Sequence, residues 1–415
     1  MSQNEQTIPV VIVGGGQAGL SLSWYLCREA VDHVVLEAGT ACHSWDDERW
    51  DNFCLVTPNW QCQLPGHPYA GNDPHGFMVK NEIIDYVRSF RDSFTPPLRE
   101  HTRVTSVTRH EEGGYRVVAD EAVWHAQHVV IASGAYHDAV IPGYAGAIDP
   151  AIVQIHSQDY RNAAQLPEGA VLVVGSGQSG AQIVEDLHLE GRKVHLCVGT
   201  APRVSRFYRG RDVVDWLADM KFYDLTVNRH PLRDGARDKT NHYVTGRNGG
   251  HDLDLRQFAK EGVGLHGTLE AIRDEVAHFL PDLRENLDDA DKTNADIKAS
   301  IDAHIARVGI AAPVEAPYVP VWEPERGNTP LDLKAAGIAA ILWCIGFRPD
   351  YRWIDVPVFN GATKPVWDRG VTDAPGFYFL GLPWLHTWGS GRFSGISRDA
   401  AWLARQITGK EIPIA

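Results

Sequence analysis

Two glycine-rich segments of the same pattern constrain the fold of this chain more than any other feature. The first is VVIVGGGQAGLSLSWYL, which starts at Val10, and the second is VLVVGSGQSGAQIVEDL, which starts at Val171. Each is a short run of apolar residues, then glycines, then a stretch with helical spacing. Such runs are typical of strands buried on both faces of a parallel sheet. The pattern predicts an α/β fold with two Rossmann-like dinucleotide-binding domains.

The first loop has the spacing Gly14-x-Gly16-x-x-Gly19. These glycines allow a tight turn, a close approach to a pyrophosphate and close packing of the helix on the strand. The helix N-terminus then offers free N–H groups to phosphates. Glu37 stands eighteen residues after Gly19 and can accept hydrogen bonds from a ribose diol. We therefore predict that FAD binds here. The predicted site also includes the neighbouring Gln17, Ala18 and Ala38.

The second loop repeats the spacing at Gly175, Gly177 and Gly180, but the equivalent of Glu37 is Val198. Arginines follow instead of an acid, and arginine can bind a 2′-phosphate through charge-assisted pairs. This predicts a second site for NADPH, with a preference for NADPH over NADH. The arginines are Arg203, Arg206, Arg209 and Arg211, and we favour Arg203 and Arg206 as ligands, together with Gln178 and Ser179 of the loop.

Two more buried strands are expected late in the chain, from Ile338 to Ile345 and in FYFLGLP from Phe377. The simplest arrangement returns both strands to the first sheet, so that the NADPH domain is inserted in the FAD domain. Residues 1–166 would then form the first part of the FAD domain. Residues 167–325 would form the NADPH domain with a helical insertion from Ala271 to Arg307, and residues 326–415 the C-terminal part of the FAD domain.

Composition excludes several classes of function. The net charge of −14 argues against binding to nucleic acid or to an anionic membrane, since either requires a basic face. Six scattered cysteines without C-x-x-C spacing predict neither a disulfide framework nor a metal site. A polar N-terminus and the lack of a long apolar run indicate a cytoplasmic protein. A homodimer stays open.

The chain resembles the class B flavin-dependent monooxygenases, which include the flavin-containing monooxygenases and the plant auxin-forming enzymes. The resemblance is strongest in 10–65, in 171–180 and in the segments CIGFRPD and FYFLGLP. The family fingerprint F-x-G-x-x-x-H-x-x-x-[YF] is half present: His156 and Tyr160 match its second part, whereas Pro150 and Ile152 replace its Phe and Gly.

The resemblance implies further site residues. In SWDDERWD it places Trp45, Arg49 and Trp50 near FAD, and in CIGFRPD it places Gly346 at the flavin segment. Asn59 stands where some members place an asparagine that faces the flavin. Beyond the resemblance, the aromatic C-terminal segment contains His386, which is a candidate acid/base or hydrogen-bonding group, against ordinary packing.

The function implied by the resemblance is monooxygenation. NADPH would reduce FAD, the reduced flavin would form a C4a-(hydro)peroxyflavin with O₂, and one oxygen atom would enter a small organic substrate. The reaction would be N- or S-oxygenation or of Baeyer–Villiger type. The alternative is an NADPH-dependent flavin oxidoreductase that passes electrons to another acceptor, such as a quinone. A disulfide reductase is disfavoured, because no cysteine pair is present and Leu382 follows Gly381.

Overall fold

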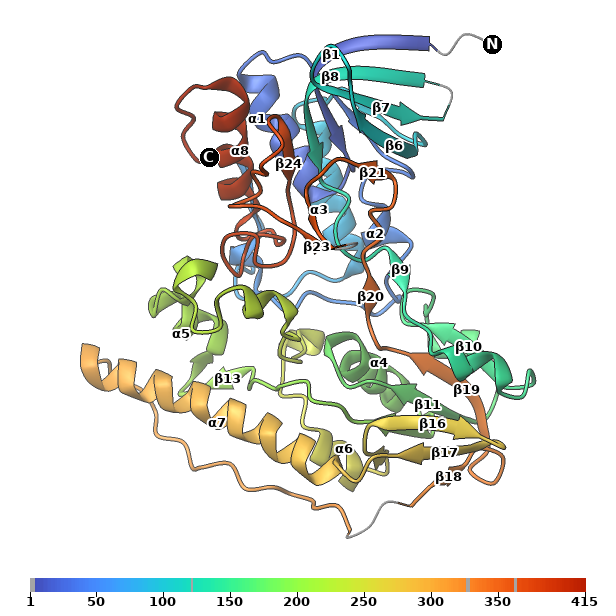
Figure 1. Cartoon of the computed structure of the whole chain (residues 1–415). Coiled ribbons are helices and arrows are strands. Elements are labelled where there is room, and N and C mark those ends of the chain that lie inside the picture. The colour runs from blue at the N-terminus through green and yellow to red at the C-terminus, as the bar shows by residue number, and fades with distance from the viewer. Residues whose placement is uncertain (1–3, 121, 326–328, 362–363) are drawn as a thin grey trace.

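The computed structural model describes residues 4–120, 122–325, 329–361 and 364–415. The chain forms two units, each built on a sheet with parallel strands at its centre, which lie one above the other in Figure 1. Each glycine-rich segment begins at the central strand of one sheet and continues into a helix that covers that sheet. The mixed α/β class predicted from the sequence is confirmed.

The upper unit holds an eight-stranded sheet in the order β21-β6-β7-β8-β1-β2-β5, with β24 also paired to β8. Strands β1, β2, β8 and β24 run parallel, whereas β6, β7 and β8 form an antiparallel meander. Helices α1 and α8 pack side by side against it (Figure 1). The strands are β1 (Asn4–Val13), β2 (His33–Leu36), β5 (Leu98–Arg99), β6 (Val104–Arg109), β7 (Tyr115–Ala119), β8 (Ala122–Ile131), β21 (Ile354–Asp355) and β24 (Phe377–Phe379).

The lower unit holds a five-stranded parallel sheet in the order β10-β19-β11-β12-β15. A small antiparallel sheet packs on it, and Ile272 and Phe279 share a buried cluster with Leu172 and Val174. The parallel strands are β10 (Val153–His156), β11 (Ala170–Val174), β12 (Val194–Cys197), β15 (Gly264–His266) and β19 (Ile338–Trp343). The antiparallel strands are β16 (Leu269–Arg273), β17 (Val276–Phe279) and β18 (Leu331–Asp332).

The expectation that the strand from Ile338 to Ile345 returns to the first sheet is wrong. Strand β19 lies between β10 and β11 in the second sheet, and only β24 joins the first sheet as predicted. A buried apolar strand needs a neighbouring strand to pair with and cover on both faces of the sheet. The edge of β11 offers such a position as well as the edge of β8 does. The boundaries predicted at 166/167 and 325/326 therefore do not follow sheet membership, since both β10 and β19 belong to the lower unit.

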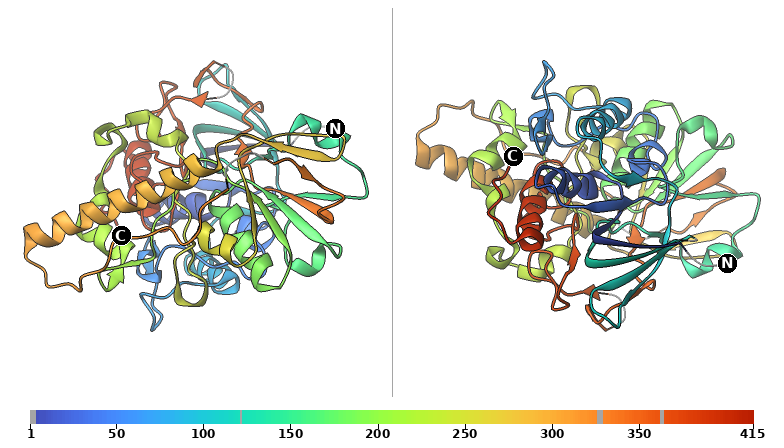
Figure 2. Two further views of the ribbon diagram at one scale, coloured as in Figure 1. Left: turned by 90° about the horizontal axis from the view of Figure 1, so that it is seen from below. Right: turned by 90° about the horizontal axis from the view of Figure 1, so that it is seen from above.

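Helices cover both sheets, and α7 runs along the outer side of the lower unit with one end projecting (Figure 2). The helix predicted from Ala271 to Arg307 starts later, because residues 269–279 form the β16–β17 hairpin. The helices are α1 (Gln17–Arg28), α2 (His43–Asp46), α3 (Lys80–Asp92), α4 (Gln178–Leu189), α5 (Val213–Asp219), α6 (Leu255–Lys260), α7 (Leu283–Val308) and α8 (Ile396–Thr408). Among the described residues, no helix has the length and apolar character required to cross a bilayer.

The remaining strands are two-residue pairs in connecting segments. They are β3 (Gln63–Leu64) with β4 (His67–Pro68), β9 (Asp138–Ala139) with β20 (Phe347–Arg348), β13 (Phe207–Tyr208) with β14 (Arg211–Asp212), and β22 (Phe359–Asn360) with β23 (Lys364–Pro365). The β9–β20 pair lies where the chain passes between the two units (Figure 1).

Candidate functional site: two glycine loops and the segments between them

The first loop leaves open space at its central glycine. A Cβ atom at Gly14 would lie 2.5 Å from Ala132 O, and one at Gly19 would lie 1.9 Å from Gly14 O. A Cβ atom at Gly16 would meet no described atom within 4 Å. Gly14 and Gly19 are therefore required by packing within the protein, whereas at Gly16 the space is free for a ligand.

Helix α1 begins directly behind this space, with Gly16 as its N-cap. Among the residues that the structure describes, no side chain caps it, and its first turn has no acid. Its first N–H groups and the positive end of its dipole are available to an anion. Gln17 is engaged within the protein, because its Nε2 donates to Gly391 O at 3.2 Å and its Oε1 accepts from Trp45 Nε1 at 3.2 Å. A helix start of this kind can bind an anion such as a pyrophosphate.

The second loop repeats this geometry. A Cβ atom at Gly175 would lie 2.6 Å from Cys344 O, and one at Gly180 would lie 1.9 Å from Gly175 O. A Cβ atom at Gly177 would meet only Thr240 Cγ2, at 3.7 Å, among the described atoms. Within the described part of the chain, helix α4 also starts without a side-chain cap or an acid in its first turn. Gln178 is again bound to the protein, donating to Val244 O at 2.6 Å.

Glu37 distinguishes the first loop from the second. Its carboxylate accepts the N–H of Gly15 at 2.6 Å and the N–H of Gly39 at 2.8 Å. In the second loop, Ser176 Oγ accepts the N–H of Gly199 at 3.0 Å and no carboxylate takes the place of Glu37. Glu37 therefore braces its own loop, and each of its oxygens has further lone pairs for a ribose. Ala18 packs under the C-terminal segment, close to Gly381, and Ala38 is exposed.

Trp45 lies beside the first loop, where its Nε1 donates to Gln17 Oε1, and Arg49 lies over Trp45, while their predicted place near FAD stays a prediction. Trp45 stacks on Phe393 with ring centroids 5.5 Å apart, and the Arg49 guanidinium lies 5.3 Å from the Trp45 ring centroid. Burial lowers the pKa of Arg49. Trp50 has other neighbours than Trp45 and Arg49. It is buried in the core of the lower unit together with Tyr160. Trp50 therefore connects the two units by packing.

Asn59 is buried and its amide is engaged within the protein. Its Nδ2 donates to Asp73 O at 2.9 Å, and its Oδ1 accepts the N–H of Met78 at 2.8 Å. These two bonds hold the 73–78 segment against the short helix that starts at Asn59. The contacts give Asn59 a structural function, and its predicted role toward the flavin stays a prediction.

Arg203 and Arg206 are both buried and both have carboxylate partners inside the protein. Arg203 Nε lies 2.6 Å from Asp291 Oδ1, and Arg206 Nη2 lies 2.5 Å from Asp212 Oδ1. Arg206 is only 1% exposed and also donates to Val56 O of the upper unit at 2.6 Å. These contacts stabilise the fold around the second loop. Binding of a 2′-phosphate by either arginine stays a prediction.

His386 lies in the segment between β24 and α8. Burial, and to a smaller extent the nearby Arg369 and Arg398, lower its pKa to about 4, while Asp368 acts in the opposite direction. The imidazole is therefore neutral at neutral pH and can accept or donate a hydrogen bond without a charge. Its backbone O accepts the N–H of Val227 at 2.7 Å, which ties this segment to the 213–238 region.

Gly346 and the two matching fingerprint residues hold the connection between the units. Gly346 has a φ of 86°, and its carbonyl oxygen is 3.1 Å from His156 Nε2 and accepts the N–H of Val140 at 3.0 Å. Tyr160 donates to Asp186 Oδ2 of α4 at 2.7 Å. His156 and Tyr160 therefore act as structural contacts between the 153–160 segment, the crossover at Gly346 and the helix behind the second loop.

Sequence reasoning missed Gly391 and Arg392 in the segment before the last helix. Gly391 O accepts from Gln17 Nε2 at the first loop, and Arg392 Nη2 donates to Asn241 Oδ1 at 2.9 Å, next to Thr240, whose methyl group lies near Gly177 of the second loop. The signal available in the sequence was a third glycine-rich stretch, WGSGRFSG, just before the last helix.

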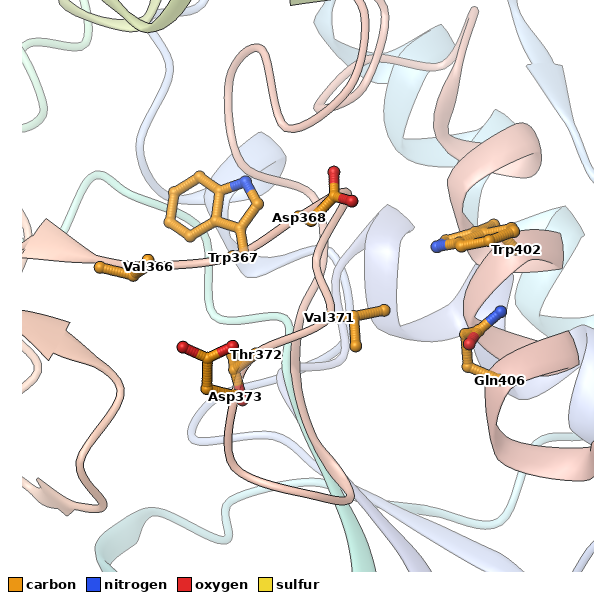
Figure 3. A pocket seen from close by; sticks show the side chains of 8 residues that line it. All are labelled: Val366, Trp367, Asp368, Val371, Thr372, Asp373, Trp402 and Gln406. Carbon is orange, nitrogen blue, oxygen red and sulfur yellow. The ribbon is translucent and has the colours of Figure 1, made fainter. Parts of the chain in front are cut away.

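A separate hollow of about 420 Å³ lies between the 366–373 segment and the second half of α8 (Figure 3). Trp367 and Trp402 lie on opposite sides of it, with Asp368 and Gln406 at its edge (Figure 3). It contains no residue of either glycine loop, so we do not assign the chemistry of the site to it.

Comparisons with known proteins agree with this geometry. The family model described as pyridine nucleotide-disulphide oxidoreductase matches residues 11–217. A CzcO-like protein from Geobacillus kaustophilus, named an uncharacterized oxidoreductase, is 27% identical over 409 residues, which are 97% of this chain and 99% of that protein. A probable indole-3-pyruvate monooxygenase from Arabidopsis thaliana is 29% identical over 205 residues, which are 47% of each chain.

The chain is thus similar in sequence to probable indole-3-pyruvate monooxygenases and in fold to flavin monooxygenases. The structure of a flavin-containing monooxygenase from Stenotrophomonas maltophilia is 21% identical to it and covers 97% of this chain and 99% of that chain, with a TM-score of 0.65. The comparisons support an oxidoreductase of the monooxygenase type that uses FAD and NADPH. The family resemblance seen in the sequence is confirmed.

Proposed function

We propose that the chain transfers one oxygen atom from O₂ to a small organic substrate at the expense of NADPH. One observation carries the proposal. Helices α1 and α4 each begin, among the described residues, without a side-chain cap behind a glycine loop that has free space at its central glycine. Hydrogen bonds through the 388–393 and 240–245 segments connect the surroundings of these two loops. Two dinucleotide sites that open toward the same segments allow a hydride to pass from one cofactor to the other.

We assign FAD to the first loop and NADPH to the second. The N–H groups at the start of α1 would bind the FAD pyrophosphate, and Glu37 would accept hydrogen bonds from its ribose. The start of α4 would bind NADPH in the same way, without a carboxylate to repel a 2′-phosphate. Each unit is thus a proposed Rossmann-like dinucleotide-binding domain.

When bound, FAD supplies the redox chemistry by accepting a hydride from NADPH and reacting with O₂. The overall reaction balances as substrate, NADPH, H⁺ and O₂ giving oxygenated substrate, NADP⁺ and water. The protein positions the two cofactors and keeps water out. The stacked Trp45 and Phe393 supply an apolar wall near the first loop. N-oxygenation, S-oxygenation and Baeyer–Villiger reactions all fit this scheme, and product analysis distinguishes them.

The alternative is a flavin oxidoreductase that passes electrons to a non-oxygen acceptor such as a quinone. The names of the relatives that match over their full length favour this coarser class, since they are called only oxidoreductases. Disulfide reduction fits less well. All six cysteines, each of them in the described part of the chain, are unpaired, and burial raises the pKa of Cys42, Cys62 and Cys344 to about 12. Such thiols are poor nucleophiles.

The deciding experiment follows the oxygen atom. The FAD-loaded enzyme is supplied with NADPH, ¹⁸O₂ and a panel of amines, sulfides and ketones, and products are analysed by mass spectrometry. We expect one ¹⁸O atom in the product and NADPH consumption that depends on the substrate. NADPH consumption that requires a quinone and leaves every panel compound unlabelled would favour the alternative. Cytoplasmic localisation and a homodimer stay predictions.

A further inference from the structure

The end of β12 marks the place where the adenosine ribose of a pyridine nucleotide would lie in the second site. In the first unit Glu37 directly follows β2 and is placed to accept hydrogen bonds from a ribose. In the second unit Val198 directly follows β12, and the N–H of the next residue, Gly199, donates to Ser176 Oγ at 3.0 Å. A 2′-phosphate would therefore lie against residues 198–200. Selection of NADPH over NADH requires a cation there.

Arg203 follows this segment, but the fold covers its charge. Its side chain is only 3% exposed, with Nε 2.6 Å from Asp291 Oδ1 and Nη1 4.0 Å from Asp254 Oδ2. The Tyr318 ring centroid lies 4.2 Å from its Cζ, and the Tyr318 hydroxyl donates to Asp254 at 2.7 Å. Nη2 has no hydrogen-bond partner among the described residues, and it is closed off from solvent. A phosphate could reach this cation only by displacing a carboxylate and an aromatic ring.

Arg206 is equally inaccessible to a phosphate. Its side chain is 1% exposed, and it binds Asp212 Oδ1 at 2.5 Å and Val56 O at 2.6 Å. The Phe77 ring centroid lies 4.7 Å from its Cζ. Val56 and Phe77 belong to the upper unit, so the guanidinium connects the two units and is already neutralised by Asp212.

The other two arginines lie on the β13–β14 hairpin, away from the end of β12. Arg209 Nε is 3.3 Å from Asp302 Oδ1, and Arg211 is paired with an acid as well. Asn286, in the first turn of α7, donates to Val198 O at 3.0 Å. Asp302 follows sixteen residues later on the same helix, which corresponds to about 24 Å along the axis. Neither arginine can reach a phosphate beside Val198.

The segment at the end of β12 supplies no positive charge of its own. Val198 is buried and Thr200 is exposed and uncharged. The nearby charge is negative, because Thr268 Oγ1 lies 3.5 Å from Val198 O and donates to Asp282 Oδ2 at 2.7 Å. The four arginines that follow the second loop, all in the described part of the chain, thus leave no accessible cation where a 2′-phosphate would lie.

We infer that the second site takes NADH as readily as NADPH. Groups common to both nucleotides would hold either one: the N–H groups at the start of α4 bind the pyrophosphate, and the backbone of residues 198–200 borders the ribose. An added 2′-phosphate would lie beside the exposed Thr200, where it gains no ion pair and stays hydrated. NADH supplies the same hydride, so substrate, NADH, H⁺ and O₂ give oxygenated substrate, NAD⁺ and water.

This inference rests on the proposed function, which assigns a pyridine dinucleotide to the second loop. It replaces the preference for NADPH that the four arginines suggest in the sequence. The difference has a simple physical cause, since an arginine selects a phosphate only where its charge is unpaired and open to the ligand.

Binding of NADP⁺ and NAD⁺ to the FAD-loaded enzyme tests the inference without turnover, because the two molecules differ only in the 2′-phosphate. Each is titrated by calorimetry. We expect Kd values within about threefold of each other, since a charge-assisted pair to the phosphate, worth at least about tenfold, is missing. Initial rates with NADPH and NADH should give values of kcat/KM that are as close as the Kd values.

A cation added at the end of β12 should create the missing selectivity. Thr200→Arg should tighten NADP⁺ binding by at least about tenfold and leave the Kd of NAD⁺ unchanged. Thr105→Arg is the matched control, because Thr105 is also exposed but lies on β6 of the upper unit. The control adds the same charge to the protein and should bind both nucleotides like the unchanged enzyme.

Arg203→Ala separates a structural role from a role toward the cofactor. It should lower the free energy of unfolding, because Asp291 and Asp254 lose their partner, while the two Kd values stay equal to each other. A rise in the Kd of NADP⁺ alone would show that Arg203 binds the 2′-phosphate. The titration of the unchanged enzyme and Thr200→Arg decide the question if this variant does not fold.

The inference is overturned if the unchanged enzyme binds NADP⁺ at least about tenfold more tightly than NAD⁺, which is the factor expected for a charge-assisted pair. It is also overturned if Thr200→Arg gives no gain for NADP⁺, because the phosphate would then lie elsewhere. Failure of the proposed function gives other results. Either neither nucleotide binds, or both bind equally and no ¹⁸O reaches any substrate.

Discussion

A Cβ atom at Gly19 would stand 1.9 Å from the carbonyl oxygen of Gly14, so the helix and the strand of the first unit touch at these two glycines. Gly16, between them in the sequence, has no described neighbour at all within 4 Å of such an atom. The three glycines of the motif thus have two separate functions. Two of them allow the protein to pack, and one keeps space free in front of the helix.

Gly16→Ala should therefore abolish FAD binding without unfolding the protein. The new methyl group fits in the free space, and replacing an N-cap glycine with alanine costs about 1 kcal/mol or less of unfolding free energy. The same methyl group would project toward a bound pyrophosphate. The measurement is FAD content after reconstitution together with the free energy of unfolding of the apoprotein. Gly19→Ala is the control and should fail to fold stably. Normal FAD content in Gly16→Ala would contradict the assignment.

Gly177→Ala should act on NADPH alone. The added methyl group would make only an ordinary contact with Thr240 Cγ2, at 3.7 Å, so the fold and the FAD content should be retained. We expect the KM for NADPH to rise at least about tenfold, because the backbone of this loop could no longer approach a pyrophosphate. Steady-state kinetics and the flavin spectrum give both readouts. A loss of FAD with an unchanged KM for NADPH would reverse the assignment of the two sites.

Arg206→Ala should destabilise the protein. The buried Asp212 would lose its charged partner, and removal of one member of a buried ion pair costs about 3–5 kcal/mol. Chemical denaturation measures this loss, and Arg206→Lys should recover part of it. The ratio of kcat/KM for NADPH to that for NADH is measured on the same variants. A fall in this ratio at unchanged stability would show that the guanidinium binds the 2′-phosphate instead.

The lowered pKa of His386 predicts a pH dependence of stability. The folded protein keeps this imidazole neutral down to about pH 4, while the unfolded chain binds a proton below its ordinary value of 6.5. Stability is therefore lost as the pH falls from 6.5 toward 4. His386→Gln should flatten this part of the curve of unfolding free energy against pH. His266→Gln should do the same, since burial and His195 lower the pKa of His266 to about 4.

The role of His386 in turnover can be tested on the same variant. An imidazole that stays neutral above about pH 5 adds no inflection to kcat near pH 6.5. The profiles of the unchanged enzyme and of His386→Gln should therefore have the same shape between pH 6 and 8. An inflection near 6.5 that disappears in the variant would show that His386 titrates during turnover as a general acid or base.

The sequence by itself determined the parts of the molecule that depend on neighbours in the chain. Strand, glycine turn and helix follow one another within about twenty residues at Val10 and again at Val171, so their pattern predicts both loops correctly. The presence of Glu37 after the first loop and its absence after the second were readable for the same reason. The strand at Phe377 also joined the predicted sheet.

Only the tertiary structure decided which partners distant residues meet. An apolar strand such as β19 can be buried in either parallel sheet, since its local pattern does not distinguish one open edge from another. A charged side chain does not reveal its partner either. Arg206 binds Asp212 and Val56, which occupy it, whereas Arg392 meets Trp388 and Asn241, which leave its charge unpaired. Pairing across the fold depends on packing of both units, and that packing is not encoded in any local spacing.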